Sequence, residues 1–320
     1  MLGWRKLVAL AVLGLEWTSL AHAQGGKAAK KGPVGPAVTA CPGGVTLRVS
    51  PGTIGQGNLA LIDVQSKSAL TGVKGDWGGK EIGFWKEPAK PKSASNQPDH
   101  WRALLGVDLD KNTGPQVLTV FVSKPGSDAV GCGANLVVRQ GHYPTERLKV
   151  ENQFVEPNEE QAARAKEDQA KLRAVFDTVT PDRLWTGRFR LPLDGVTTGG
   201  NFGRRRVLNG KAGSPHGGVD FPALSGTPVH ASQAGRVAIA ESMFFSGNTV
   251  VVDHGLGIYT FYCHLSEINV KVGDAVEAGA VLGKVGATGR VTGPHLHWAL
   301  SVNHARVNAM EIVTIFPHGG

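Results

Sequence analysis

The chain has 320 residues, three cysteines, a formal net charge of +8 and a sequence pI of about 9.5. Three cysteines are too few for a disulfide-rich scaffold, and the length allows two domains or one large domain. The positive charge suits an anionic cell envelope, nucleic acid or lipid headgroups equally, so charge alone does not select a partner.

The first 23 residues have the pattern of a secretory signal peptide. Arg5 and Lys6 form a basic start, residues 7–15 are apolar, and Ala21-His22-Ala23 provides a small-residue cleavage site. A membrane-spanning helix needs about 20 apolar residues, and this apolar run is shorter. We therefore expect an exported protein that does not span the membrane and has no nucleic-acid partner. It would be periplasmic, or extracellular if the source lacks an outer membrane.

Residues 24–37 are rich in Gly, Lys, Ala and Pro and are predicted to form a flexible lead-in. Residues 38–150 alternate short apolar runs with turn residues, which predicts a small accessory domain resembling a β-sandwich. Its expected strands cover residues 45–49, 59–64, 116–122 and 134–138. Cys41 and Cys132 bracket this region. In an oxidising compartment we favour a disulfide between them over two free buried thiols.

Residues 151–183 are predicted to be a short helical linker. Asn158 and Gln161 have the spacing of a capping box, and Pro181 ends the pattern. The apolar positions step by three and four, with polar Gln169 interrupting them. They are Ala162, Ala165, Leu172, Val175, Phe176 and Val179. We expect this helix to pack by a narrow face.

Residues 184–320 are predicted to form a second, all-β domain, because β-branched and aromatic runs again alternate with glycine-containing turns. The expected strands cover residues 236–239, 248–252, 258–263 and 281–285. After Trp185 the sequence shows no helix of useful length.

Two clusters in this half carry metal-donor side chains. In an extended strand, residues two or four apart point to one face, so His295 and His297 project together, as do His216 and Asp220 if the residues between them are extended. Two strands that present paired nitrogen and oxygen donors can enclose zinc at about 2.0–2.2 Å. Either cluster alone is a weak signal, but their combination in one domain favours a metal site.

Strand alternation also brings His264 into consideration. Positions 258, 260, 262 and 264 share one side of an extended strand, whereas Cys263 points to the other side. If His264 faces the metal, it is a candidate either for supporting a metal ligand or for catalysis, and Cys263 is expected to be a small buried residue. Tyr262 is expected to pack.

The remaining basic residues give weaker signals. His254 is predicted to cap or pack at a turn, and His230, His304 and His318 lack partners at ligand spacing. The basic run at residues 204–206 either meets anionic stem peptides or forms a solvated loop.

Six ordered motifs between about residues 184 and 316 resemble the lysostaphin-type zinc endopeptidases, which cut peptidoglycan peptides. They are Asn201-Phe-Gly-Arg-Arg205, His216-Gly-Gly-Val-Asp220, Gly247-Asn-Thr-Val250, Asp253-His-Gly255, Tyr262-Cys-His-Leu265 and Gly286-Ala-Thr-Gly-Arg-Val-Thr-Gly-Pro-His-Leu-His297. The segment before them resembles, more weakly, an accessory domain of Gram-negative members. The resemblance implies a mainly β protein with an antiparallel β-sheet metallopeptidase domain of the duplicated-hybrid-motif type at residues 184–320.

The resemblance also implies the roles of the site residues. His216, Asp220 and His297 would bind one zinc ion per chain, and His264 and His295 would be the catalytic histidines beside the bound water. The substrate would be peptidoglycan stem peptides or cross-links. The bond cut stays open: D-alanine to diaminopimelate, diaminopimelate to diaminopimelate, or a glycine bridge.

Two other interpretations compete with an active peptidase. A catalytically silent family member would bind and activate another cell-wall hydrolase, although such relatives usually lack some of these five residues. A lipoyl- or biotinyl-type carrier would modify Lys284, whose neighbours show no hairpin tip. For an enzyme we further expect the first domain or the linker to gate the cleft, because an exported wall hydrolase endangers its own cell. A division or envelope regulator is a further possible partner, which the sequence does not identify.

Overall fold

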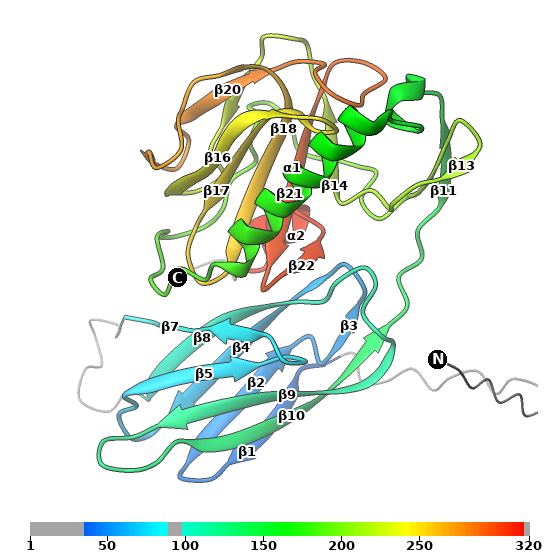
Figure 1. Cartoon of the computed structure of the whole chain (residues 1–320). Coiled ribbons are helices and arrows are strands. Elements are labelled where there is room, and N and C mark those ends of the chain that lie inside the picture. The colour runs from blue at the N-terminus through cyan, green and yellow to red at the C-terminus, as the bar shows by residue number, and fades with distance from the viewer. Residues whose placement is uncertain (1–34, 89–97, 317–320) are drawn as a thin grey trace, which may run out of the picture. The chain divides into compact units, whose positions relative to one another are not determined.

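The computed structural model describes residues 35–88 and 98–316. The predicted signal peptide, most of the lead-in and His318 lie outside the described residues. The described chain is mainly β, with one long helix, so the predicted fold class is confirmed (Figure 1). Within these residues, neither helix combines the length and the apolar character needed to cross a bilayer.

Two five-stranded sheets make up the described part of the N-terminal region. The first, in spatial order, contains β1 (Ala37–Cys41), β2 (Val45–Ser50), β4 (Leu59–Ser66), β8 (Asp99–Gly106) and β7 (Trp85–Lys86). The second contains β3 (Thr53–Gly55), β10 (Val130–Arg139), β9 (Gly114–Ser123), β5 (Gly72–Asp76) and β6 (Glu81–Gly83). Alternate residues of both sheets enter one core, where Leu47, Ile62, Leu118 and Leu136 are fully buried. This face-to-face packing is that of a β-sandwich.

A disulfide joins the two sheets of the sandwich. It connects Cys41 at the end of β1 with Cys132 on β10, 91 residues later. The favoured pairing is therefore present. Closing so long a loop restricts the unfolded chain, which in the chain-entropy account stabilises the fold by a few kcal/mol.

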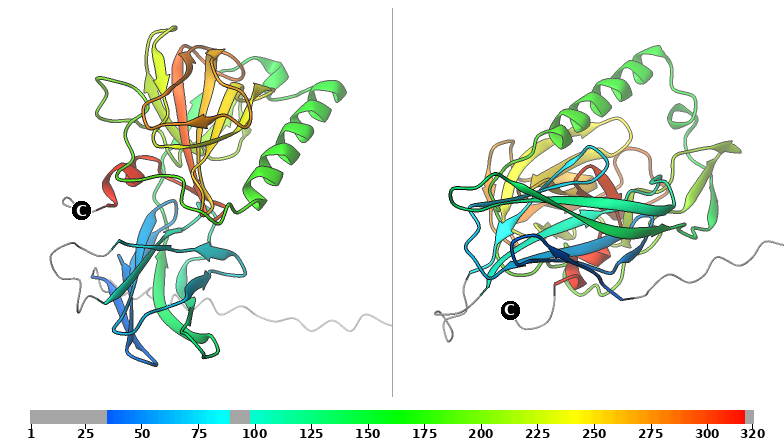
Figure 2. Two further views of the ribbon diagram at one scale, coloured as in Figure 1. Left: turned by 90° about the vertical axis from the view of Figure 1, so that its left-hand side faces the viewer. Right: turned by 90° about the horizontal axis from the view of Figure 1, so that it is seen from below.

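Helix α1 (Glu159–Asp177) follows β11 (Thr145–Leu148) and the short 3-10 helix η1 (Asn152–Phe154). Its predicted capping box is present, since the Asn158 side chain accepts from the Gln161 backbone and Gln161 caps in return. Leu172, Val175 and Phe176 pack on an apolar cluster from the strands beneath. The helix therefore lies on the outer face of the C-terminal sheet and packs on it by a narrow face (Figure 2).

The C-terminal region is a nine-stranded sheet whose described strand pairs are all antiparallel. Its main path is β14 (Gly218–Pro222), β21 (His295–Val302), β18 (Ile258–Ile268), β17 (Gly247–Asp253), β16 (Gly235–Met243) and β19 (Ala275–Val276), with β15 (Pro228–His230), β20 (Val281–Val285) and β22 (Ala305–Val307) attached. A smaller sheet joins β11 to β12 (Arg205–Leu208) and β13 (Lys211–Ala212), and α2 (Met310–Thr314) follows β22.

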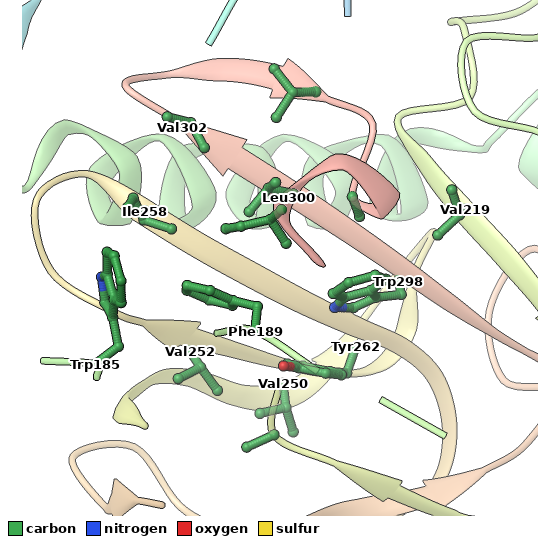
Figure 3. Packing of buried hydrophobic residues seen from close by; sticks show 14 of the residues in the cluster. Trp185, Phe189, Val219, Val250, Val252, Ile258, Tyr262, Trp298, Leu300 and Val302 are labelled. Atoms are coloured by element: carbon green, nitrogen blue, oxygen red, sulfur yellow. The ribbon is translucent and has the colours of Figure 1, made fainter. Parts of the chain in front are cut away.

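One face of β18 and β21 is anchored in a large aromatic and aliphatic core (Figure 3). Tyr262 and Trp298 are opposite each other in the register and are both fully buried. Truncating a buried side chain of this size typically costs about 3–5 kcal/mol. This rigid layer fixes the strand ends that carry the candidate site.

The core of the C-terminal sheet also includes residues from sandwich strands, among them Leu59, Leu61 and Trp85. The domain limits at residues 150 and 183 therefore stay a prediction. Lys284 lies inside β20, opposite Pro228, and its ammonium group pairs with Glu267 at 2.7 Å. It is not at a hairpin tip, which removes the structural basis for a carrier domain.

Candidate metal centre

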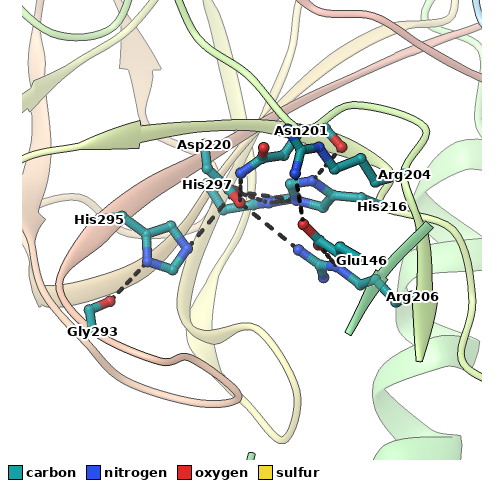
Figure 4. A network of polar contacts seen from close by, with 9 residues as sticks. All are labelled: Glu146, Asn201, Arg204, Arg206, His216, Asp220, Gly293, His295 and His297. Carbon is teal, nitrogen blue, oxygen red and sulfur yellow. Dashed lines mark hydrogen bonds and ion pairs between the residues drawn. The ribbon is translucent and has the colours of Figure 1, made fainter. Parts of the chain in front are cut away.

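Three side chains converge on one point. His216, Asp220 and His297 form the one group of His, Cys, Asp and Glu side chains in the described ranges whose donor atoms all lie within 4.8 Å of one another. The His216 Nε2 atom is 2.8 Å from His297 Nδ1 and 3.1 Å from Asp220 Oδ1, and His297 Nδ1 is 2.9 Å from Asp220 Oδ1 (Figure 4). The four-coordinate zinc geometry requires edges of about 3.3 Å, so the three donors have nearly this spacing.

Strand register brings the donors together. Asp220 on β14 is directly opposite His297 on β21, and opposed residues project to the same face. His216 precedes β14 by two residues. Gly218, which lies between His216 and Asp220 in the sequence, leaves room for the His297 imidazole, because a Cβ at position 218 would be 2.6 Å from His297 Nε2.

The donor atoms of these side chains are acceptors that face one another, an arrangement that a bound cation would stabilise. The His216 Nδ1 atom bonds the carbonyl oxygen of Asn201 at 2.9 Å, so in the neutral ring Nδ1 donates and Nε2 carries a lone pair. That lone pair faces a second ring nitrogen and a carboxylate oxygen. Such a cluster of acceptors is stabilised by a metal ion, and nitrogen and carboxylate donors suit zinc.

Asp220 is held as a carboxylate. Burial raises its pKa, but hydrogen bonds and charge interactions with His216 and His297 outweigh burial and hold the pKa well below its usual range. Its second oxygen, Oδ2, accepts from the Asn201 amide at 3.4 Å and lies 3.7 Å from the Arg206 guanidinium. The Asn201 and Arg206 contacts orient a metal ligand, which is a recurrent feature of metal sites.

His264 and His295 lie beside the triad, and both rings bond a backbone carbonyl through Nδ1. The Nδ1 atom of His264 lies 2.8 Å from the carbonyl oxygen of Thr288, and that of His295 lies 2.8 Å from the carbonyl oxygen of Gly293. Each Nδ1 therefore donates, and each Nε2 is left as an acceptor. The two rings are 4.9 Å apart, and His295 Nε2 is 3.7 Å from Asp220 Oδ1. The structure thus gathers all five predicted residues.

His264 reaches the site by a route that strand alternation did not predict. Between Tyr262 and Leu265 the pairing with β17 shifts register, and His264 has a φ of 64° in the left-handed region. The expectation that His264 shares a face with Tyr262 is therefore wrong, because Tyr262 points into the core. A non-glycine residue in this region costs about 1–3 kcal/mol. Burial, followed by the charges of His297 and His295, lowers the pKa of His264 to about 3.

The expected orientation of Cys263 is also wrong. Cys263 is directly opposite His297, so it lies on the same face of the sheet as His297 and Asp220. It is nevertheless outside the group of donors that could hold one ion. Burial raises the pKa of its thiol to about 12, which agrees with the predicted role as a small buried residue.

A cleft opens next to the triad, with a volume of about 100 Å³. Its lining includes Asp220, His264 and His295, together with Glu146 from β11 and the guanidinium-bearing residues Arg206 and Arg290. Arg206 belongs to the basic run predicted either to meet anionic stem peptides or to form a solvated loop. Asn201 and Arg290 lie in sequence motifs, and neither had a predicted role. Glu146 is 74 residues before Asp220, and no motif near it in the sequence predicted a place in the site.

Three other histidines in the described part of the C-terminal region have partners outside the cleft. His254 is fully buried, so it does more than pack at a turn: its Nδ1 bonds the carbonyl of Ala234 at 2.8 Å. His230 bonds Gly279, and His304 lies 3.4 Å from Asp177. None of these lines the cleft.

Several known proteins that resemble this chain are peptidases. Residues 214–309 match Peptidase family M23. The peptidoglycan DD-endopeptidase ShyA of Vibrio cholerae is 44% identical over 132 residues, which is 41% of this chain and 31% of ShyA. The DD-carboxypeptidase/endopeptidase Mpg of Neisseria meningitidis is 40% identical over 102 residues, 32% of this chain and 24% of Mpg. These matches span about a third or less of each relative's length.

A larger part of the chain resembles a solved structure. A crystal structure from Pseudomonas aeruginosa, assigned to peptidase M23, has 28% sequence identity and a TM-score of 0.59. The similarity covers 82% of this chain and 95% of that chain. It therefore extends beyond the residues that match the family, and the predicted resemblance to the lysostaphin-type peptidases is confirmed.

Proposed function

Because residues 214–309 form a domain of peptidase family M23, we propose that this protein is a zinc-dependent endopeptidase that hydrolyses peptide cross-links in peptidoglycan. One observation carries the proposal: His216, Asp220 and His297 converge beside two further histidines whose Nδ1 atoms are bonded to backbone carbonyls, which leaves their Nε2 atoms for proton transfer. The relatives named as peptidoglycan DD-endopeptidases support the substrate class.

His216, Asp220 and His297 would hold one zinc ion per chain and leave a fourth position open. A zinc ion bound in this way supplies Lewis-acid polarisation of the scissile carbonyl and lowers the pKa of its bound water to about 7. The single carboxylate among the three ligands leaves the site with net positive charge, which stabilises an oxyanion.

His264 and His295 supply the proton transfers. With Nδ1 committed to a backbone carbonyl, either ring can accept a proton from the attacking water at Nε2 and then donate it to the leaving amine. A ring protonated at Nε2 can also donate a hydrogen bond to the tetrahedral oxyanion. The carbonyls of Thr288 and Gly293 remain bonded to Nδ1–H in both states. The pair thus provides one base and one hydrogen-bond donor, in either assignment.

The site of action follows from the leader. We propose that the signal-peptide pattern in residues 1–23 directs the protein to the periplasm, where peptidoglycan lies. Fusion to a reporter enzyme that functions after export, with and without residues 1–23, tests this location. Reporter activity that does not depend on the leader would contradict it.

The function is tested on purified sacculi. The mature protein should contain about one zinc ion per chain and should release peptides, and chelation should abolish release until zinc is restored. His297→Ala should lose both zinc and activity. His230→Ala is the matched control, because His230 bonds a backbone carbonyl away from the cleft.

The catalytic pair is tested separately from the metal. His264→Ala and His295→Ala should keep zinc and lose about 10²–10⁴-fold in rate, the usual contribution of positioned acid–base groups. If either variant with full zinc content cleaves at the wild-type rate, that residue is not catalytic. Zinc binding with no release of peptides by the wild type would instead favour a silent regulator of another hydrolase.

A further inference from the structure

Two arginines line the cleft, and neither has a part in the proposed proton transfers. Arg206 is on β12, and Arg290 is on the loop before β21. Both line the same cleft as Asp220, His264 and His295. Burial, followed by the charge of Arg206, lowers the pKa of the Arg290 guanidinium. The carboxylates of Glu146 and Asp220 also line the cleft, and both lie beside Arg206. Arg290 is therefore the guanidinium of the cleft lining that is left to attract an anion.

Arg290 is positioned without using its N–H donors. Its guanidinium carbon lies 4.8 Å from the centroid of the Phe245 ring, and its backbone N–H donates to the Phe245 carbonyl. Stacking on an aromatic face holds the planar group in place. Within the described residues, no carboxylate lies within 4.0 Å of this guanidinium and its side chain has no hydrogen bond. Its N–H fork is thus available to a ligand.

A carboxylate of the protein already occupies the neighbouring position. The Glu146 carboxylate, with 14% of its side chain exposed, lies 3.2 Å from Arg206 Nε and 3.3 Å from Arg204 Nη1. Arg206 in turn lies 3.7 Å from Asp220 (Figure 4). This side of the cleft therefore accommodates a carboxylate beside a metal-ligand candidate.

We propose that Arg290, together with Arg206, recognises a free carboxylate of the substrate beside the scissile amide. This inference rests on the proposed function and narrows it. In both cross-links that involve diaminopimelate, the carbon that bears the amide nitrogen also carries a free carboxylate, whereas a glycine bridge has none there. The substrate class is then the diaminopimelate cross-link with that carboxylate unmodified. Arg290 is a specificity-determining residue, with five donors that match a carboxylate in a bidentate pair.

Paired substrates test this assignment. Two synthetic cross-linked peptides would differ only at the diaminopimelate carboxylate beside the scissile amide, which is free in one and amidated in the other. The wild type should prefer the free acid by about 10- to 100-fold in kcat/KM, the usual effect of a hydrogen bond to a charged group. In Arg290→Gln this preference should fall to about 1. Arg204→Gln removes the same charge from a residue outside the cleft lining and should retain the preference.

A binding measurement separates recognition from hydrolysis. Fluorescence anisotropy on metal-free protein would use a labelled peptide ending in diaminopimelate, as the free acid or as the amide. Tighter binding of the acid by the wild type, lost in Arg290→Gln at unchanged Tm, supports the assignment. If the acid is preferred in binding but neither cross-linked peptide is cleaved, the proposed hydrolysis fails and carboxylate recognition stands. Equal binding and cleavage of acid and amide by the wild type would overturn the assignment.

Discussion

The stability of the C-terminal sheet should depend on pH through His254. This ring is completely buried, with Nδ1 2.8 Å from the carbonyl of Ala234 and Nε2 2.7 Å from the hydroxyl of Thr260. That hydroxyl lies 2.9 Å from the Tyr262 phenol, which accepts from the backbone of Ser232. The neutral ring satisfies both neighbours, donating through Nδ1 and accepting through Nε2. A protonated ring would place a charge in the interior, away from water.

The size of the effect follows from the pKa of His254. Burial lowers this pKa from 6.5 to about 4. The unfolded chain therefore binds a proton first as pH falls, and the free energy of unfolding decreases between about pH 6.5 and 4. At about 1.4 kcal/mol per pH unit, the full loss is about 3 kcal/mol, with about 2.5 kcal/mol gone by pH 4.5. Above pH 7 the contribution is constant.

The assay is urea unfolding of the wild type and His254→Asn at several values between pH 4.5 and 7.5. The variant is less stable at pH 7.5 because it leaves buried partners unsatisfied, but it lacks the titration. The stability gap between the two proteins should therefore narrow by about 2.5 kcal/mol at pH 4.5. All other titrating groups are common to both proteins and cancel.

A gap that stays constant from pH 7.5 to 4.5 would refute this reasoning. If His254→Asn does not fold, the imidazole resonances of the wild type provide the same information. They should show His254 neutral at pH 5.5, where a free imidazole is mostly charged. A His254 that titrates near 6.5 in the folded protein would contradict the account.

Three further predictions concern the cleft and the linker. Glu146→Gln should raise the rate on sacculi several-fold if the end of the first predicted domain gates the cleft, since it releases β11 from Arg204 and Arg206. Glu156→Gln, at an exposed residue paired with Lys211, is the control, and an unchanged rate for Glu146→Gln would count against gating. Gly218→Ala should lower zinc content and activity together, because its Cβ would meet the His297 ring; full zinc occupancy in this variant would contradict the role of the glycine. Asn158→Ala should lower the free energy of unfolding by about 1 kcal/mol through loss of the helix cap, as measured by urea unfolding.

Local patterns predicted most of the fold. The capping box at Asn158 and Gln161 and the β-branched runs are properties of short segments, and both are present in the structure. The pairing of His295 with His297 followed from strand alternation. The expected disulfide between Cys41 and Cys132 needed only the cysteine count and an oxidising compartment.

Other features depend on contacts that no local pattern encodes. His264 leaves the alternation of β18 at a register shift and a left-handed backbone, which the sequence did not indicate. The contact of Glu146 with Arg206 joins strands 60 residues apart in a parallel pairing. The orientation of Arg290 depends on Phe245, from the turn between β16 and β17. Alternation therefore identified the metal-donor pairs, whereas the surroundings of the cleft required the tertiary structure.

We propose that the triad of His216, Asp220 and His297 holds a zinc ion used to hydrolyse cross-links in peptidoglycan. Mass spectrometry of muropeptides after digestion of purified sacculi tests it most directly, with zinc-loaded wild type, metal-free wild type and His297→Ala compared in parallel. We predict that zinc-loaded wild type alone converts cross-linked dimers into monomers with a free diaminopimelate amine. Dimers that persist in the presence of zinc-loaded wild type, or products cut in the glycan strand, would contradict the claim.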